Sequence, residues 1–217
     1  MKKKLLIMSV AMVLVCAFAV GMTIAYLTST DRVVNTFTVG NVQIKLDEAK
    51  VDAYGEPVGS PAPRVKDNTY KLIPGHTYTK DPTVTVLSGS ESSYIKMTVT
   101  FTEAAALDAI FAPNGADLTE IFNGYNPANW IYKGNTENTG NNTRTYEFWY
   151  KEVVPAVPAT AEDVALDALF DSITVPGNIN NNQLATIAGM TITVNAYAIQ
   201  ADGFADAAAA WAAYPAD

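Results

Sequence analysis

The sequence predicts a mainly β protein, an antiparallel jelly-roll-like β-sandwich with a few short inserted helices. Several segments alternate apolar and polar residues with the period of a half-buried strand. These segments are rich in β-branched and aromatic residues, which fit a pleated sheet surface. Clusters of Gly, Pro, Asn and Ser separate them, as expected for turns. Beyond the first 25 residues, about 190 remain, which is enough to bury a core without disulfide bonds.

The strand pattern recurs along the chain. In the first strand the alternation changes phase near Gly40, which indicates a bulge or bend. Two aromatic runs that flank the Asn- and Gly-rich loop 134–143 predict a hairpin. In the last strand, the even-numbered residues Ile192 to Ala198 are apolar and share one face. The expected strands are 37–46, 83–87, 94–102, 130–132, 145–150 and 190–199.

Three short helices are expected between or after the strands. Residues 103–111 have helical spacing, and Thr160 with Asp163 resembles a capping box that opens a helix over 161–170. An Ala-rich helix over 205–213 carries Trp211, which could fix it to the sandwich. The stretch 47–68 contains three prolines and predicts a long irregular connection, and 153–160, with two prolines, predicts a surface linker.

The N-terminus has the pattern of a secretory signal peptide. Three lysines precede an apolar run over 5–20, and Thr23 and Ala25 supply small residues at the −3 and −1 positions of a cleavage site. We therefore expect a signal peptidase to remove residues 1–25 by cutting between Ala25 and Tyr26. The remaining residues, 26–217, then form a single β-sandwich domain outside the cell.

Two other interpretations of the N-terminus are open. The apolar stretch 5–25 is long enough to span a bilayer as an uncleaved anchor, and this is the only membrane contact that we expect. Lipidation of Cys16 is the second interpretation, but Val15 stands where a lipoprotein site requires Gly, Ala or Ser.

The mature chain is acidic. The first 25 residues carry three lysines and no acid, so 11 basic and 22 acidic residues remain, a net charge of −11. Such a surface repels nucleic acid and anionic lipid, so neither is an expected partner. The single cysteine lies in the signal, so the mature chain has no disulfide framework and no thiol chemistry.

The sequence contains no motif for catalysis, a cofactor or a catalytic metal. Its one histidine, His76, follows Pro74-Gly75, where an exposed turn histidine is the ordinary interpretation. Calcium is the one ion worth considering, because several carboxylates stand at the ends of expected strands and helices, although not in EF-hand spacing. These residues are Asp81, Asp117, Glu120, Asp171 and Asp202.

A series of aromatic residues lies on the expected hairpin. It could form a platform for stacking sugars, but alternate members facing the core explain it more simply. The series is Trp130, Tyr132, Tyr146, Phe148, Trp149 and Tyr150.

Several stretches together resemble one known family. Residues 25–31 read A-Y-L-T-S-T-D and 35–46 read N-T-F-T-V-G-N-V-Q-I-K-L; further on, 72–86 read L-I-P-G-H-T-Y-T-K-D-P-T-V-T-V and 94–99 read Y-I-K-M-T-V. In this order behind such a signal, they resemble the SipW-dependent exported proteins of Gram-positive bacteria, the family of the biofilm fibre protein TasA and the camelysins. The segments 103–129 and 134–143 have no counterpart in that pattern.

The resemblance implies a function. It implies a secreted structural subunit of an extracellular fibre or biofilm matrix, which donates an N-terminal β-strand to the next subunit. Its partners are then further copies of itself and other matrix or cell-wall components. The donor here is residues 26–34, with Tyr26, Leu27, Val33 and Val34 as its apolar side chains. An ordinary first strand or a frayed terminus is the alternative interpretation of this segment.

Two other functions are open. Camelysins have been described as metalloproteases, so the resemblance also implies a cell-surface protease, for which we find no metal-ligand motif. A monomeric adhesin or glycan-binding module is the third hypothesis, based on the aromatic series. Fibre growth with concentration, casein cleavage and retention on a polysaccharide column distinguish the three.

Overall fold

The computed structural model describes residues 2–21, 40–111 and 121–215. The chain divides into two units, Met1–Thr38 and Val39–Asp217. In the first unit, the described residues form the helix α1, Lys2–Gly21. No helix in the described part of the chain is both long and apolar enough to cross a membrane.

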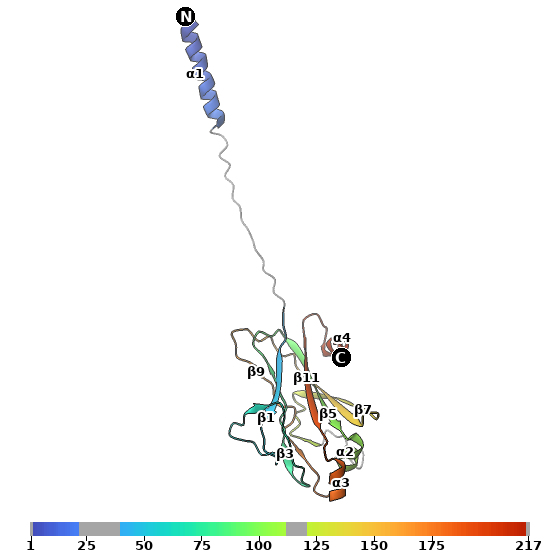
Figure 1. The fold of residues 1–217 in the computed structure, drawn as a ribbon. Coiled ribbons are helices and arrows are strands. Elements are labelled where there is room, and N and C mark those ends of the chain that lie inside the picture. The colour runs from blue at the N-terminus through green and yellow to red at the C-terminus, as the bar shows by residue number, and fades with distance from the viewer. Residues whose placement is uncertain (1, 22–39, 112–120, 216–217) are drawn as a thin grey trace. The chain divides into compact units, whose positions relative to one another are not determined.

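The second unit is an antiparallel β-sandwich, so the predicted fold class is confirmed (Figure 1). The described residues of the whole chain form eleven strands in three antiparallel sheets, together with short helices in this unit. The first sheet has the strand order β11-β5-β8-β7 and consists of the longest strands. These are β5 Ser93–Thr102, β7 Trp130–Asn138, β8 Thr143–Tyr150 and β11 Ile192–Gln200.

The second sheet has the order β2-β1-β4-β9. It contains β1 Ile44–Ala49, β2 Arg64–Val65, β4 Thr83–Val86 and β9 Val164–Ala165. A third, smaller sheet has the order β3-β10-β6. It consists of β3 Thr77–Thr79, β6 Phe122–Asn123 and β10 Ser172–Thr174.

The core lies between the inner faces of these sheets. In β5, buried and half-buried residues alternate along the whole strand, as period-2 patterning predicts. Phe122 stacks on Phe170 at a centroid distance of 4.6 Å and meets Tyr146 and Phe148 edge to face. Together with the aliphatic residues of the core, these rings bury apolar area, which is the main stabilising term.

The helices agree only partly with the sequence prediction. The expected helices over 103–111 and 205–213 are present as α2, Ala104–Phe111, and α4, Ala207–Ala213. The helix expected over 161–170 is wrong, because this segment is extended and pairs through β9 with β4. The helix α3, Asn181–Thr186, was not expected, although Asn180 forms a capping box at its start.

Three irregular segments were also assigned wrongly. The hairpin loop is shorter than 134–143, because β7 continues to Asn138 past a bulge between Tyr132 and Gly134. The stretch 47–68 contains the end of β1 and all of β2. The stretch 153–160 is not a surface linker throughout, because Val154 and Val157 are buried.

Candidate functional site

Two sheet edges that lack a partner strand lie beside each other. β11 pairs only with β5 among the described strands, and the first half of β1 pairs only with β4. β1 and β11 are in contact and run side by side in Figure 1. Unpaired edges expose rows of backbone donors and acceptors, so their neighbourhood can receive a further strand.

The register shows which groups of β11 face its open edge. Thr102 N–H donates to Thr191 O over 3.1 Å and Ala201 N–H donates to Ser92 O over 2.7 Å, which places both residue pairs at hydrogen-bonded positions. Hydrogen-bonded positions alternate along an antiparallel pair. The odd-numbered residues of β11 therefore bond to β5. The N–H and C=O groups of the even-numbered residues point away from β5, and these residues are Ile192, Val194, Ala196, Ala198 and Gln200.

The same reasoning applies to β1. Leu87 N–H donates to Gln43 O over 2.9 Å, so the hydrogen-bonded positions toward β4 are the odd-numbered residues. The backbone groups of Ile44 and Leu46 therefore point to the side opposite β4. On that side the pairing of β1 with β2 begins only at Glu48, which lies opposite Val65.

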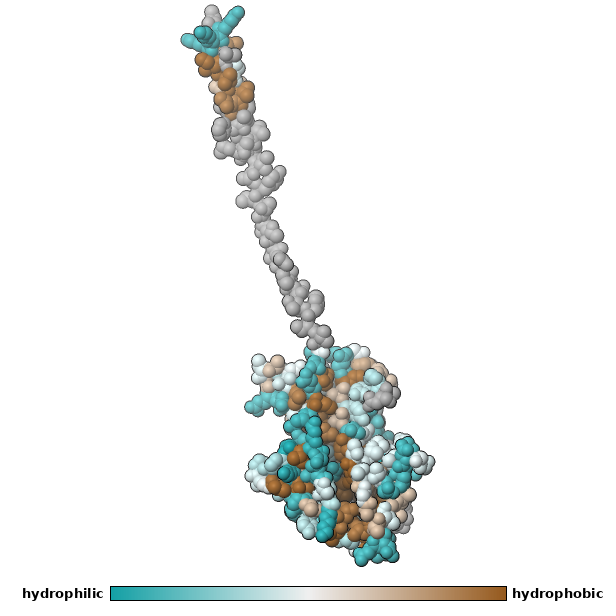
Figure 2. Space-filling model, in the orientation of Figure 1, coloured by the Kyte–Doolittle hydropathy of each residue, from teal (hydrophilic) through white to brown (hydrophobic). Residues whose placement is uncertain are grey.

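An open groove of ≈ 470 Å³ lies between these edges. Its lining comes from both strands and combines aliphatic residues with Asn195 and Tyr197: Ile44, Leu46, Val194, Asn195, Ala196 and Tyr197. Figure 2 shows this region as a brown, hydrophobic band that runs down the middle of the folded unit. The aliphatic side chains are half-buried and pack against the core, so the groove exposes the edge of the core to solvent.

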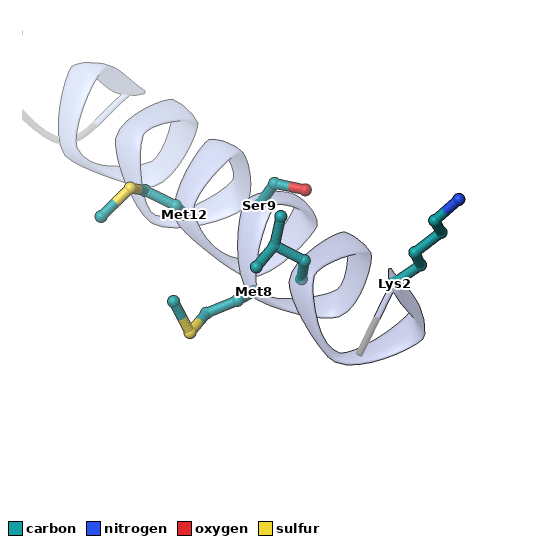
Figure 3. A pocket seen from close by; sticks show the side chains of 5 residues that line it. Lys2, Met8, Ser9 and Met12 are labelled. Carbon is teal, nitrogen blue, oxygen red and sulfur yellow. The ribbon is translucent and has the colours of Figure 1, made fainter.

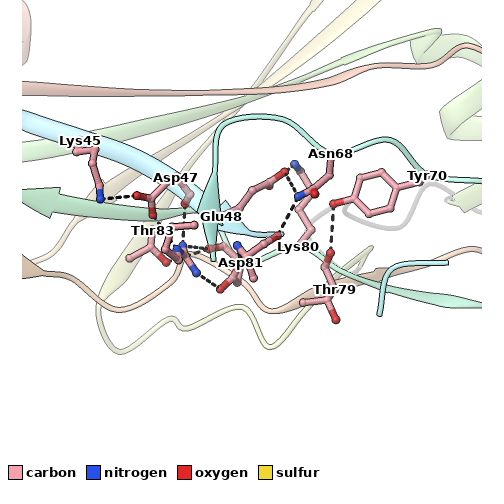
Figure 4. Close-up of polar contacts among 11 residues, drawn as sticks. Lys45, Asp47, Glu48, Asn68, Tyr70, Thr79, Lys80, Asp81 and Thr83 are labelled. Carbon is pink, nitrogen blue, oxygen red and sulfur yellow. Dashed lines mark hydrogen bonds and ion pairs between the residues drawn. The ribbon is translucent and has the colours of Figure 1, made fainter. Parts of the chain in front are cut away.

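Charged residues fix β1 beside this groove (Figure 4). Asp47 is buried and accepts from Lys45 Nζ at 2.7 Å and from Arg64 Nε at 2.8 Å. Arg64 also pairs with Asp81, which accepts from the backbone N–H of Ala49 at 2.6 Å. Burial alone would raise the pKa of Asp47, but the hydrogen bonds from Lys45 and Arg64 outweigh it and lower the pKa below 3.8.

A second polar cluster lies on the other side of the same strand end. Glu48 and Lys80 are both buried and form an ion pair of 2.6 Å. Asn68 donates from Nδ2 to the other oxygen of Glu48 at 2.9 Å. Sequence reasoning missed this cluster, because its members are separated by 20 and 32 positions in a stretch with little periodicity.

The residues assigned to export and strand donation cannot be compared with the structure. The cleavage residues Ala25 and Tyr26 lie outside the described residues. The other apolar donor residues, Leu27, Val33 and Val34, lie outside them as well.

The structure describes some of the residues considered for metal binding and catalysis. Asp81 holds Arg64, and Asp117 and Glu120 lie outside the described residues. In the described part of the chain, no group of three or more His, Cys, Asp or Glu residues could hold a metal ion. His76 is half-buried rather than exposed, because its Nε2 bonds Tyr54 O at 2.6 Å and its ring packs against Tyr78.

The aromatic series on the hairpin mainly serves the core, as the simpler interpretation predicted. Trp130, Tyr146 and Phe148 are fully buried, and Tyr132 and Tyr150 pack against the core. Trp149 lies on the opposite face, where Lys133 Nζ is 4.3 Å from its ring centroid.

One further surface depression lies on α1 (Figure 3). All the residues that line it come from one face of that helix: Lys2, Leu5, Met8, Ser9 and Met12. Because the depression has no wall from a second element, it carries no functional argument.

Comparisons with protein families, curated proteins and solved structures give no match to this chain. The site therefore defines the chain only as a β-sandwich with an open groove between two sheet edges.

Proposed function

We propose that this chain is a secreted structural subunit of an extracellular fibre or biofilm matrix. In this proposal, a signal peptidase frees the N-terminus at Tyr26. The segment 26–34 then inserts as a β-strand into the groove of the next copy. The groove between β1 and β11 is the observation that carries the proposal.

The groove has the chemistry that an inserted strand requires. The five even-numbered residues of β11, together with Ile44 and Leu46 of β1, direct backbone N–H and C=O groups to the open side of their strands. Each new backbone hydrogen bond contributes about 0.5–1.5 kcal/mol net, so a full row stabilises the joint by several kcal/mol. Backbone pairing supplies affinity in this mode of recognition, and side-chain pockets supply specificity.

The proposed donor matches β11 in length and carries apolar side chains near both of its ends. Residues 26–34 are nine in number, as are the residues of β11, so the two strands can pair over their whole length. Along an extended strand Tyr26 and Val34 face one side and Leu27 and Val33 the other, so either pair can place two apolar side chains against the aliphatic residues of the groove. Covering this lining removes half-buried apolar surface from water, which adds to the backbone term.

The test uses the chain that begins at Tyr26 and a variant that lacks residues 26–34. We expect the first to form fibres in a concentration-dependent manner, as seen by negative-stain microscopy. The second should remain a folded monomer. A control with a Gly/Ser segment of equal length in place of 26–34 separates the effect of sequence from that of chain length.

Three results would overturn the proposal. Fibres of normal length from the deletion variant would exclude strand donation. A chain that stays monomeric at all concentrations would exclude self-assembly. Casein cleavage that a chelator abolishes would instead support the protease function.

A further inference from the structure

Glu48, Asn68 and Lys80 form a cluster in which one carboxylate holds both an amine and a carboxamide (Figure 4). Lys80 Nζ lies 2.6 Å from Glu48 Oε2, and Asn68 Nδ2 lies 2.9 Å from Glu48 Oε1. The amine and the amide are therefore held side by side by the two oxygens of a single side chain.

The surroundings exclude most water from the ion pair between Glu48 and Lys80, while Asn68 is half-buried. The side chains of Lys80 and Glu48 are only 8% and 9% exposed. Tyr70 adjoins the cluster, and burial, followed by the charge of Glu48, raises its pKa. Its ring packs edge to face on that of the buried Tyr78 at 5.6 Å. The ion pair between Lys80 and Glu48 is therefore poorly solvated.

The carbonyl group of Asn68 also has a fixed donor. The backbone N–H of Val51 donates to Asn68 Oδ1 at 3.0 Å, while Nδ2 also donates to Ala49 O at 2.9 Å. The carboxamide is thus held on both sides, and a backbone donor lies where negative charge would develop on the oxygen during attack at Cγ.

We propose that this chain forms an intramolecular isopeptide bond between Lys80 Nζ and Asn68 Cγ, with Glu48 as the proton carrier. Lysine is the nucleophile, the side-chain amide is the acyl donor, and ammonia is the leaving group. The reaction needs no oxidant, cofactor or second protein.

The atoms balance in the following way. Glu48 Oε2 takes a proton from the ammonium group of Lys80, and the neutral amine attacks Cγ of Asn68. The carbonyl electron pair moves to Oδ1, toward the N–H of Val51. The Cγ–Nδ2 bond then breaks, and the attacking nitrogen gives up a proton through Glu48, so that Nδ2 leaves as ammonia. The new amide keeps one hydrogen, and the remaining proton stays on Glu48 until ammonia or solvent takes it.

The bond would join the end of β3 to the connection that follows β2. It closes the loop between residues 68 and 80, and a closed loop loses less entropy when the chain folds. This inference rests only on the cluster, so it can be true or false independently of fibre assembly.

Intact-mass measurement of the full chain, purified folded and then denatured, is the direct test. We expect the mass to fall below the sequence mass by one molecule of ammonia. Trypsin should release a branched peptide that joins residues 67–71 to residues 72–96, with no cleavage after Lys80. Lys80→Arg and Glu48→Gln should each retain the full sequence mass.

Lys45→Arg is the matched control, because Lys45 lies on the same strand as Glu48 but binds Asp47. This variant should still lose ammonia. The wild-type mass decides the question even if the variant of Glu48 or Lys80 fails to fold. An unchanged mass would overturn the proposal. Ammonia loss that maps to another asparagine, or that persists in Glu48→Gln, would overturn it as well.

Discussion

Replacing Ala196 by Pro tests the open edge of β11 without breaking the sheet. The N–H of Ala196 points away from β5, so the new ring removes no hydrogen bond of the β5–β11 ladder. A Pro whose ring nitrogen faces the free side of an edge strand is tolerated. We therefore expect the unfolding free energy of Ala196→Pro to stay close to that of wild type.

Assembly should respond much more strongly. An inserted strand would lose the hydrogen bond from this N–H, worth about 0.5–1.5 kcal/mol, and the opposing carbonyl would be left without a donor at a further cost of about 1–3 kcal/mol. Each 1.4 kcal/mol corresponds to about a factor of ten in the association constant. The concentration at which fibres appear should therefore rise at least about tenfold, as measured by sedimentation of assembled material.

Asn195→Pro is the matched control at the neighbouring position. The N–H of Asn195 points to Thr98 on β5, so proline there removes a ladder bond and leaves a carbonyl unsatisfied, at about 1–3 kcal/mol of stability. Urea unfolding separates the two variants. Equal destabilisation of both would show that the assignment of the open edge is wrong, and normal assembly of folded Ala196→Pro would refute the groove as the acceptor.

Two further predictions concern stability. Because folding lowers the pKa of Asp47, its carboxylate stabilises the fold at pH values above its unfolded pKa near 3.8, and this stabilisation is lost as the pH falls through the lower pKa of the folded state. Urea unfolding across this pH range should therefore show a smaller acid-induced loss of unfolding free energy for Asp47→Asn than for wild type. Equal acid-induced losses in the two proteins would contradict that reasoning. Gly55→Ala should destabilise clearly more than Gly189→Ala. Both residues have positive φ, so alanine at either position costs about 1–3 kcal/mol in backbone strain. Only at Gly55 would the new Cβ also lie 2.6 Å from the backbone of Tyr78, because nothing lies within 4 Å of a Cβ at Gly189. Similar melting temperatures for the two variants would contradict this contact.

The sequence predicted the strands whose two faces differ in environment. β5 shows this well, because one face lies in the core and the other does not, and its period-2 pattern is uninterrupted. The inner face of β11 was also predicted, since Ile192, Val194, Ala196 and Ala198 all pack against the core.

Tertiary contacts determined what the sequence pattern could not. The spacing of a helix face is found in Leu166, Leu169 and Phe170. All three are buried, yet the segment that contains them is extended, and its Leu166 N–H donates to Val84 O. Sheet pairing outweighed the local preference there. The first strand was placed too early, because β1 begins at Ile44 and residues 40–43 form no strand.

The groove could not be predicted in the same way. Which strand lies at an edge depends on pairings between distant segments, such as β11 with β5 and β1 with β4. The cluster of Glu48, Asn68 and Lys80 depends on the same pairings, because β1, the connection after β2 and the end of β3 meet there. Nothing in the sequence around any one of these residues indicates the other two.

Amide hydrogen exchange at the open edges tests the central claim most directly. In the variant that lacks residues 26–34, the amides of Ile44, Leu46, Val194 and Ala196 should exchange rapidly, because no strand covers them. In fibres of the chain that begins at Tyr26, the same amides should become protected, and a synthetic peptide of residues 26–34 added to the variant should protect them as well. Fibres in which these four amides still exchange rapidly would contradict strand donation into the groove between β1 and β11.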